Sequence, residues 1–262
     1  SPHTGEVQGA DKGLVLGLDL YGPFAPDVDG NTFALVAVEV GHTDYSLVRL
    51  LKDKDGPTIN KAYKEMAREL ATKGKEGTPP IARVHGDDDP SFKGELADHL
   101  LTEKVDQTNT GAHRPTNNSR TERRIRTLAQ TLRANFLAAT GGMDIYDALW
   151  GPCLMFSNDR HNQSTTSKGG CAYEALTGVK PEITTDDHTF GAECTYHVPK
   201  EHRTNKRSAP GGRSIWVGRD PDTRDAHLVV PITWDAAAQH WTLGKVKRGV
   251  RNVKVKESSM PL

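Results

Sequence analysis

Three acidic residues stand where carboxylates could meet in a folded chain: Asp19, Asp87 and Glu122. Converging carboxylates repel one another unless cations lie among them. Hard oxygen ligands favour Mg²⁺ or Mn²⁺, and two such ions can assist both the attacking and the leaving oxygen in phosphodiester transfer. Each residue alone also has an ordinary explanation, namely an ion pair within a strand, a turn, or the N-terminal end of a helix dipole. Only the three together indicate this chemistry.

The elements that would position Asp19 and Asp87 follow from hydrophobic periodicity. Short apolar runs predict three consecutive strands with short connections, an antiparallel meander, over 14–20, 33–40 and 45–51. Asp19 lies inside the first of them. Pro57 begins a helical pattern with one apolar face. We expect a further strand over 81–85, ending just before Asp87, and then a helix over 92–101.

The helix that follows Glu122 has the clearest apolar stripe in the chain, formed by Ile125, Leu128, Ala129, Leu132 and Phe136. Continued backwards by three residues, this stripe reaches Glu122. We therefore expect Glu122 on the inward face, and the neighbouring arginines on other faces. A carboxylate at the start of a buried face needs compensation, for which a metal ion and the helix dipole are the two candidates.

The second half of the chain changes character. We expect a helix over 144–158, kinked or broken by Pro152, followed by a polar loop. Short strand-like runs then occur at 214–217, 227–232, 240–243 and 250–255. We therefore expect four parts, which are a flexible lead over 1–12, an α/β core over 13–160, a linker over 161–189, and a small β-rich basic module over 190–262.

Charge is balanced overall, with 34 basic and 34 acidic residues, but it is unevenly distributed. Residues 27–103 carry 15 acidic and 10 basic side chains, whereas residues 200–257 carry 13 basic and six acidic ones. Such asymmetry is typical of chains that bind a polyanion, although a solvated surface explains it equally well. Three cysteines exclude a disulfide framework and a four-cysteine zinc site. We find no membrane span or signal peptide, and because residue 1 is Ser, we expect the chain to be cut from a longer one.

Five blocks in a fixed order make the sequence similar to a known family. They are Leu18-Asp19-Leu20-Tyr21-Gly22-Pro23, His85-Gly86-Asp87-Asp88-Asp89-Pro90-Ser91-Phe92, Pro115-Thr116-Asn117-Asn118-Ser119-Arg120-Thr121-Glu122-Arg123, Tyr173-Glu174-Ala175-Leu176-Thr177-Gly178-Val179-Lys180-Pro181, and Phe190-Gly191 with Tyr196-His197-Val198-Pro199. From about residue 14 to residue 255 the chain resembles the integrase of Copia-type LTR retrotransposons. That family belongs to the retroviral integrase-like group of the ribonuclease H fold.

The resemblance implies an α/β fold with a ribonuclease H-like mixed five-stranded sheet flanked by helices, followed by a small β-rich module. It implies that Asp19, Asp87 and Glu122 are the catalytic residues and hold two Mg²⁺ or Mn²⁺ ions. The implied reaction is trimming of a DNA 3′ end, followed by attack of that 3′-hydroxyl on a target phosphodiester. Implied partners are double-stranded DNA and further copies of the chain, with no membrane. The implied location is nuclear, after a cytoplasmic particle stage, and the chain would not be secreted.

The chain departs from the family at several positions. Asp88 and Asp89 replace the usual Asn-Gly, Ser91 replaces Glu, and Ser119 replaces Gly. Thirty-four residues separate Asp87 from Glu122, one fewer than is common in the family. The zinc module that family members carry is not found in this sequence, so we expect no zinc. These departures leave open an alternative, a catalytically decayed or domesticated core that acts only as a DNA-binding or structural nucleoprotein module.

Several side chains could contact DNA. Those around the third carboxylate are His113, Asn118, Arg120, Arg123, Arg124 and Arg126. Those near the C-terminal end are Lys245, Lys247, Arg248, Arg251 and Lys254. Turn hydrogen bonds and ordinary solvated side chains are the alternatives. We expect Trp216, Trp234 and Trp241 to form core rather than base-stacking platforms, and Cys153, Cys171 and Cys194 to be buried or half-buried thiols.

Overall fold

The structure is a computed structural model that describes residues 13–109, 119–140, 144–166, 169–182, 187–203 and 209–257. The described chain forms two compact units, each built from several segments. The first contains residues 31–129 and 157–181 with the N-terminal strand, and the second contains residues 25–30, 130–156 and 182–262. The expected linker of 161–189 includes the end of one helix and the whole of another. His113 and Asn118 lie outside the described residues.

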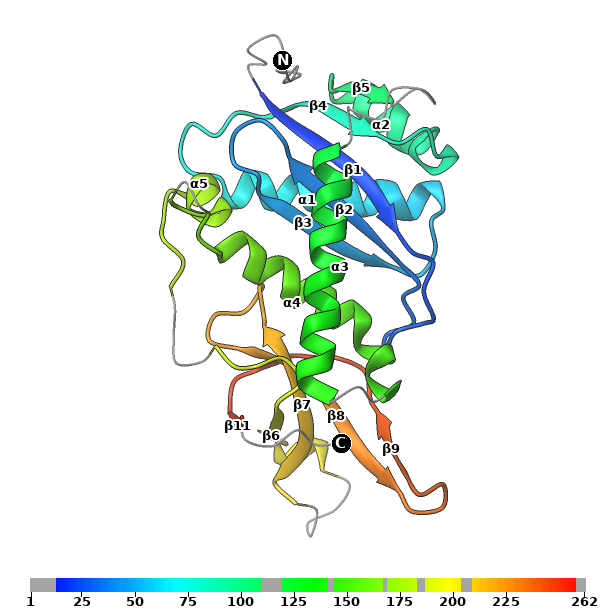
Figure 1. Cartoon of the computed structure of the whole chain (residues 1–262), viewed down its shortest axis with the longest axis vertical. Coiled ribbons are helices and arrows are strands. Elements are labelled where there is room, and N and C mark those ends of the chain that lie inside the picture. Colours follow the sequence, from blue (N-terminus) through cyan, green and yellow to red (C-terminus); the bar gives the residue numbers. More distant parts are fainter. Residues whose placement is uncertain are drawn as a thin grey trace. The chain divides into compact units, whose positions relative to one another are not determined.

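A five-stranded mixed sheet forms the centre of the first unit (Figure 1). Its strands are β1 (Leu14–Tyr21), β2 (Phe33–Glu39), β3 (Ser46–Leu51), β4 (Ile81–Gly86) and β5 (Asp106–Asn109). They lie in the order β3-β2-β1-β4-β5. The β1–β2 and β2–β3 pairs are antiparallel, whereas the β1–β4 and β4–β5 pairs are parallel. This arrangement confirms the expected α/β fold class with a mixed five-stranded sheet flanked by helices.

Alternation along β1 assigns its side chains to two faces of the sheet. Leu16 and Leu18 are buried in a core cluster with helices α1 (Gly56–Lys73), α2 (Glu95–Thr102) and α5 (Ala172–Thr177). The predicted apolar face of α1 is confirmed, because Ile59 and Met66 are fully buried in this cluster. Asp55 caps the helix by accepting a hydrogen bond from the N–H of Thr58, with Pro57 in the first turn. Asp19 belongs to the opposite face of the sheet.

Helices α3 (Ser119–Thr140) and α4 (Trp150–Gln163) each contribute residues to both units. The prediction for the start of α3 was wrong. Glu122 is exposed, and the preceding residue, Thr121, is fully buried instead. The inward face of α3 therefore begins at Thr121 and not at Glu122. It continues through the partly buried Arg124 and Ile125 to the buried Leu128. Arg124 donates hydrogen bonds to the hydroxyl of Ser46 and to the carbonyl of Asp44, and these bonds turn its side of the helix inward.

The break expected at Pro152 takes a milder form. A 3₁₀ turn over Asp144–Leu149 changes into α4 at Trp150, so Pro152 falls in the first turn of α4. Proline is tolerated there because the first N–H groups of a helix have no intrahelical acceptor.

The second unit contains a six-stranded antiparallel sheet. Its strands are β6 (Glu193–His197), β7 (Gly211–Arg219), β8 (His227–Asp235), β9 (His240–Leu243), β10 (Lys247–Val250) and β11 (Val253–Lys256). The order is β10-β8-β7-β6-β11, with β9 also paired to β8. This sheet confirms that a β-rich part follows the mixed sheet.

The tryptophans of the second unit divide into two kinds. Trp216 is fully buried and donates its indole N–H to Nδ1 of His227 at 3.1 Å. Trp241 is partly buried against a core cluster of the same unit. Trp234 remains 45% exposed, so the expectation of a core position was wrong for this residue. It lies at the outer end of the β8–β9 ribbon, opposite Trp241. All three cysteines are free and buried, as expected.

Among the described helices, none combines the length and the apolarity that a bilayer crossing requires.

Candidate active site

Asp19 and Asp87 occupy equivalent register positions with respect to the neighbouring parallel strands β1 and β4. Gly17 of β1 pairs with His85 of β4, and each carboxylate follows this pair by two residues. Asp19 is partly buried, and its Oδ1 accepts a hydrogen bond from the N–H of Leu20 at 2.8 Å. Asp87 comes directly after β4 and is exposed, with Oδ1 accepting from the N–H of Asp88 at 2.7 Å. The register of the sheet therefore carries both residues to the same end of β1 and β4.

Glu122, in the first turn of α3, acts electrostatically on Asp19. The pKa of Asp19 is raised to about 6, chiefly by burial and further by the charges of Asp87 and Glu122. The hydrogen bond from the N–H of Leu20 opposes this increase. Asp87 and Glu122, from two other parts of the chain, therefore lie within electrostatic reach of Asp19.

The donor set consists of hard oxygen atoms and suits Mg²⁺ or Mn²⁺ chemically. Mutual repulsion and burial make the ionised form of Asp19 unfavourable, and a divalent cation would remove that penalty. Within the described residues, however, no three His, Cys, Asp or Glu side chains are arranged closely enough to hold a metal ion. The carboxylates are therefore coupled but not drawn together to coordination distances.

The two unusual acidic residues after Asp87 have their own partners. Asp88 forms an ion pair with Lys93 at 2.9 Å, and Asp89 forms one with Lys54 at 3.0 Å. Asp89 also caps the short 3₁₀ turn that follows by accepting the N–H of Ser91 at 2.9 Å. Although burial acts in the other direction, the hydrogen bonds from Ser91 and Lys54 lower the pKa of Asp89 to about 2. The sequence did not indicate either lysine. Lys54 lies 35 residues before Asp89, and Lys93, although close to Asp88, belongs to no motif.

The arginines around Glu122 differ from one another. Arg123 and Arg126 are exposed. Arg120 is also exposed, but it donates a hydrogen bond to the carbonyl of Val40 at 2.8 Å. Arg124 is partly buried, and burial lowers its pKa to about 10, against the opposing charge of Asp44. These four side chains are therefore not equivalent candidates for binding phosphate.

The C-terminal cations belong to the second unit, and all five candidate side chains are exposed: Lys245, Lys247, Arg248, Arg251 and Lys254. Two of them have neighbours within the unit. The ammonium group of Lys247 lies 5.2 Å from the ring centroid of Tyr196, and Arg248 lies 3.7 Å from Asp222. The others extend from β11 and from the connections beside β10.

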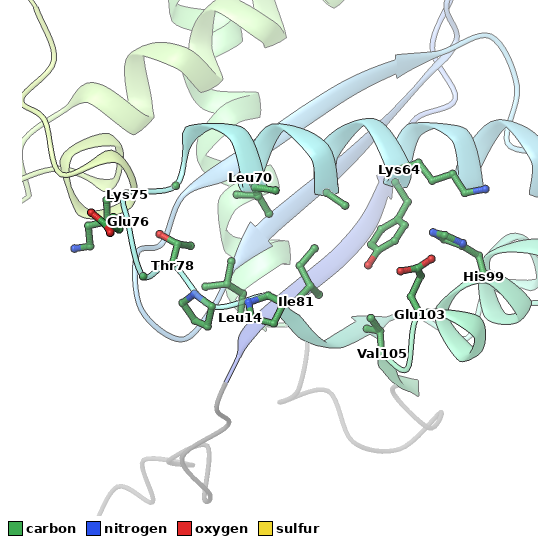
Figure 2. A pocket seen from close by; sticks show the side chains of 17 residues that line it. Leu14, Lys64, Leu70, Lys75, Glu76, Thr78, Ile81, His99, Glu103 and Val105 are labelled. Atoms are coloured by element: carbon green, nitrogen blue, oxygen red, sulfur yellow. The ribbon is translucent and has the colours of Figure 1, made fainter.

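A groove of about 800 Å³ lies at the other end of the mixed sheet (Figure 2). Its apolar part includes Leu14 and Ile81, the first residues of β1 and β4, together with Leu70. Charged side chains of both signs, Lys64 and Glu103 among them, line it as well. Because Asp19 and Asp87 lie at the opposite ends of the same strands, this groove is remote from the carboxylates and takes no part in their chemistry.

No protein-family model matches the chain, and no curated protein matches it. Among solved structures, it is similar to the catalytic core domain of BIV integrase, with 14% identity and a TM-score of 0.45 over 62% of this chain and 92% of that one. It is also similar to a chain of the simian T-cell lymphotropic virus intasome in complex with PP2A regulatory subunit B56 gamma. That match has 14% identity and a TM-score of 0.47 over 89% of this chain and 77% of that one. Likeness at this level carries no functional assignment, which has to come from the residues themselves.

Proposed function

We propose that the chain is the catalytic region of a Copia-type retrotransposon integrase, derived from a Pol polyprotein. Its reaction would be DNA 3′-end processing and strand transfer dependent on divalent cations. The observation that carries this proposal is the parallel register of β1 and β4, which brings Asp19 and Asp87 to the same end of the sheet, where the charge of Glu122 from α3 also acts on Asp19. The sequence blocks support it, because Asp19, Asp87 and Glu122 lie in the first three of the five blocks, one in each.

Asp19, Asp87 and Glu122 would hold two Mg²⁺ or Mn²⁺ ions, which supply charge stabilisation to the attacking and leaving oxygens of the phosphodiester. The N–H of Leu20 fixes one oxygen of Asp19, which leaves the other available as a ligand. Oδ1 of Asp87 accepts the backbone N–H of Asp88. Positioning and electrostatics would carry the rate, without a covalent protein intermediate.

Exposed cations would bind the phosphate backbone of double-stranded DNA without reading its sequence. Arg123 and Arg126 are suited to this role in the first unit, and Lys245, Arg251 and Lys254 in the second. We propose that several copies of the chain act together on the two ends of the element DNA, in the nucleus.

A nicking and strand-transfer assay on short DNA duplexes tests this proposal. We expect activity in Mn²⁺, which tolerates imperfect ligand geometry, and its complete loss in Glu122→Gln. Glu95→Gln is the matched control, since Glu95 is an exposed acidic residue in the first turn of α2. Equal background from all three proteins would contradict the proposal and favour a DNA-binding module without chemistry.

A further inference from the structure

Ser46, the first residue of β3, is fully buried, and each of its polar groups is bound by a side chain of α4. Its hydroxyl donates to Oδ1 of Asn158 at 2.6 Å, and its N–H donates to Oδ1 of Asn162 at 3.0 Å. Its carbonyl accepts from Nδ2 of both asparagines, at 3.0 and 2.7 Å. Since β3 is an edge strand, these two side chains replace the neighbouring strand that Ser46 lacks. They also fix α4 against the start of β3.

Arg124 brings α3 into the same cluster. One guanidinium nitrogen donates to the hydroxyl of Ser46, and another donates to the carbonyl of Asp44 at 2.9 Å. One turn earlier, Arg120 donates to the carbonyl of Val40 at 2.8 Å. Two arginines of α3, four residues apart, are thus bound to the turn that joins β2 and β3.

The turn that binds Arg120 and Arg124 is itself stabilised by the side chain of Glu39. The carboxylate of Glu39, fully buried at the end of β2, accepts hydrogen bonds from three successive N–H groups, those of Gly41, His42 and Thr43. A buried carboxylate with several such donors is strongly localised. The carbonyl groups that face Arg120 and Arg124 therefore have a defined place.

This anchor lies on the face of the sheet that carries Asp19. Asp19 pairs with Val36, and Val36 pairs with Val48, two residues beyond Ser46 on β3. Because directly opposed residues share a face, as do residues two apart, Ser46 and Asp19 lie on the same face. Glu122 lies between Arg120 and Arg124 along α3, so the anchor determines where Glu122 stands relative to Asp19.

We infer that Arg124 is a positioning residue and not a DNA contact: with Ser46, Asn158 and Asn162 it holds the first turns of α3 so that Glu122 stays within electrostatic reach of Asp19. This inference rests on the proposed function. Two of its hydrogen bonds go to partners inside the unit, whereas a phosphate contact would require the guanidinium to face solvent. Arg123 and Arg126, which are exposed, keep the phosphate-binding role.

The two roles of Arg124 make opposite predictions for Arg124→Met. A phosphate contact would lower the slope of log affinity against log salt by about 1 and weaken DNA binding. A positioning residue would leave that slope unchanged and weaken Mn²⁺ binding about tenfold, the lower end of effects seen when residues that support metal ligands are replaced. Amide hydrogen exchange over residues 119–126 would also become faster. Ser46→Ala should reproduce the metal effect, and the double variant should add little to either single change.

Arg133→Met is the matched control, because Arg133 is an exposed arginine on the same helix, and it should change neither metal binding nor exchange. If Arg124→Met does not fold, Arg124→Lys retains the charge but can serve one of the two acceptors, and an intermediate loss of Mn²⁺ affinity is expected. A reduced salt slope with normal Mn²⁺ affinity would overturn the inference. A native chain that binds no Mn²⁺ and nicks no DNA would instead overturn the proposed function. Amide hydrogen exchange over residues 119–126 would then be the measurement that tests whether Arg124 anchors α3.

Discussion

The charge of Glu122 helps to raise the pKa of Asp19, although the two residues belong to different elements, α3 and β1. Such coupling costs stability in the absence of cations, because the ionised carboxylates repel one another and Asp19 is partly buried. A bound divalent cation would offset this repulsion, and an active site of the proposed kind requires that behaviour.

Asp19→Asn should therefore stabilise the fold at neutral pH in the presence of a chelator. The pKa of Asp19 is about 6 in the folded state, against an ordinary value of 3.8 for an aspartate side chain, so the folded state binds the proton more tightly. The stability that this group contributes is present below pH 4 and is lost as the pH rises through 6. A shift of one pKa unit corresponds to about 1.4 kcal/mol, and solvent screening of this partly exposed side chain reduces the total to roughly 1–2 kcal/mol.

Urea denaturation of both proteins at pH 4 and pH 7.5 measures this difference. The variant should gain stability relative to the native chain only at the higher pH. Asparagine can still accept the N–H of Leu20, so loss of that hydrogen bond does not confuse the result. An equal difference at both pH values would show that the charge of Asp19 is not its cause.

Divalent cations should stabilise the native chain in a pH-dependent manner. A ligand that binds only the folded state adds about 2.7 kcal/mol at one hundred times its Kd. Because protons compete for Asp19, the effect of Mg²⁺ or Mn²⁺ on the melting temperature should decline as the pH falls below 6. It should be absent at every pH in Glu122→Gln. A cation effect that persists in this variant would indicate binding elsewhere.

Asp88→Asn, which restores the residue typical of the family, should change Mn²⁺ affinity by less than about twofold. The charge of Asp88 is already offset by Lys93, and exposed ion pairs of this kind contribute roughly 0–1 kcal/mol. The N–H that Asp88 donates to Asp87 belongs to the backbone and is retained. Isothermal titration with Mn²⁺ checks this. A large gain in affinity would mean that the extra carboxylate disturbs the site.

Much of the mixed sheet could be predicted from sequence, because period and turn chemistry are local. The apolar runs of β1, β2 and β3 and the 3.6-residue face of α1 are examples. The rotation of α3 could not be predicted, since it depends on what Arg124 meets. A hydrophobic stripe treats arginine as outward, whereas Ser46 and the carbonyl of Asp44 draw it inward and bury Thr121 in place of Glu122.

In the candidate site, too, some residues could be predicted from the sequence and others could not. The acidic residues were found because they stand in recognisable blocks, yet Asn158 and Asn162 carry no motif beyond a four-residue spacing on one helix face. Trp234 illustrates a further limit. Alternation along β8 places Trp234 on the same face as Ile232. At the end of the β8–β9 ribbon, however, too few residues surround the indole to cover it, and nearly half of Trp234 stays exposed.

The basic strands of the second unit should contribute sequence-independent DNA affinity. Lys245, Arg251 and Lys254 are exposed, and replacing each by Gln should lower the salt slope by about 1 for every phosphate contact removed. Lys247 lies over the ring of Tyr196, so Lys247→Gln should lower it less, because part of its interaction is already made within the unit. Fluorescence anisotropy on two unrelated duplexes at several salt concentrations measures these slopes. The triple Gln variant should lose affinity equally for both duplexes, and loss for one alone would mean that these side chains read bases.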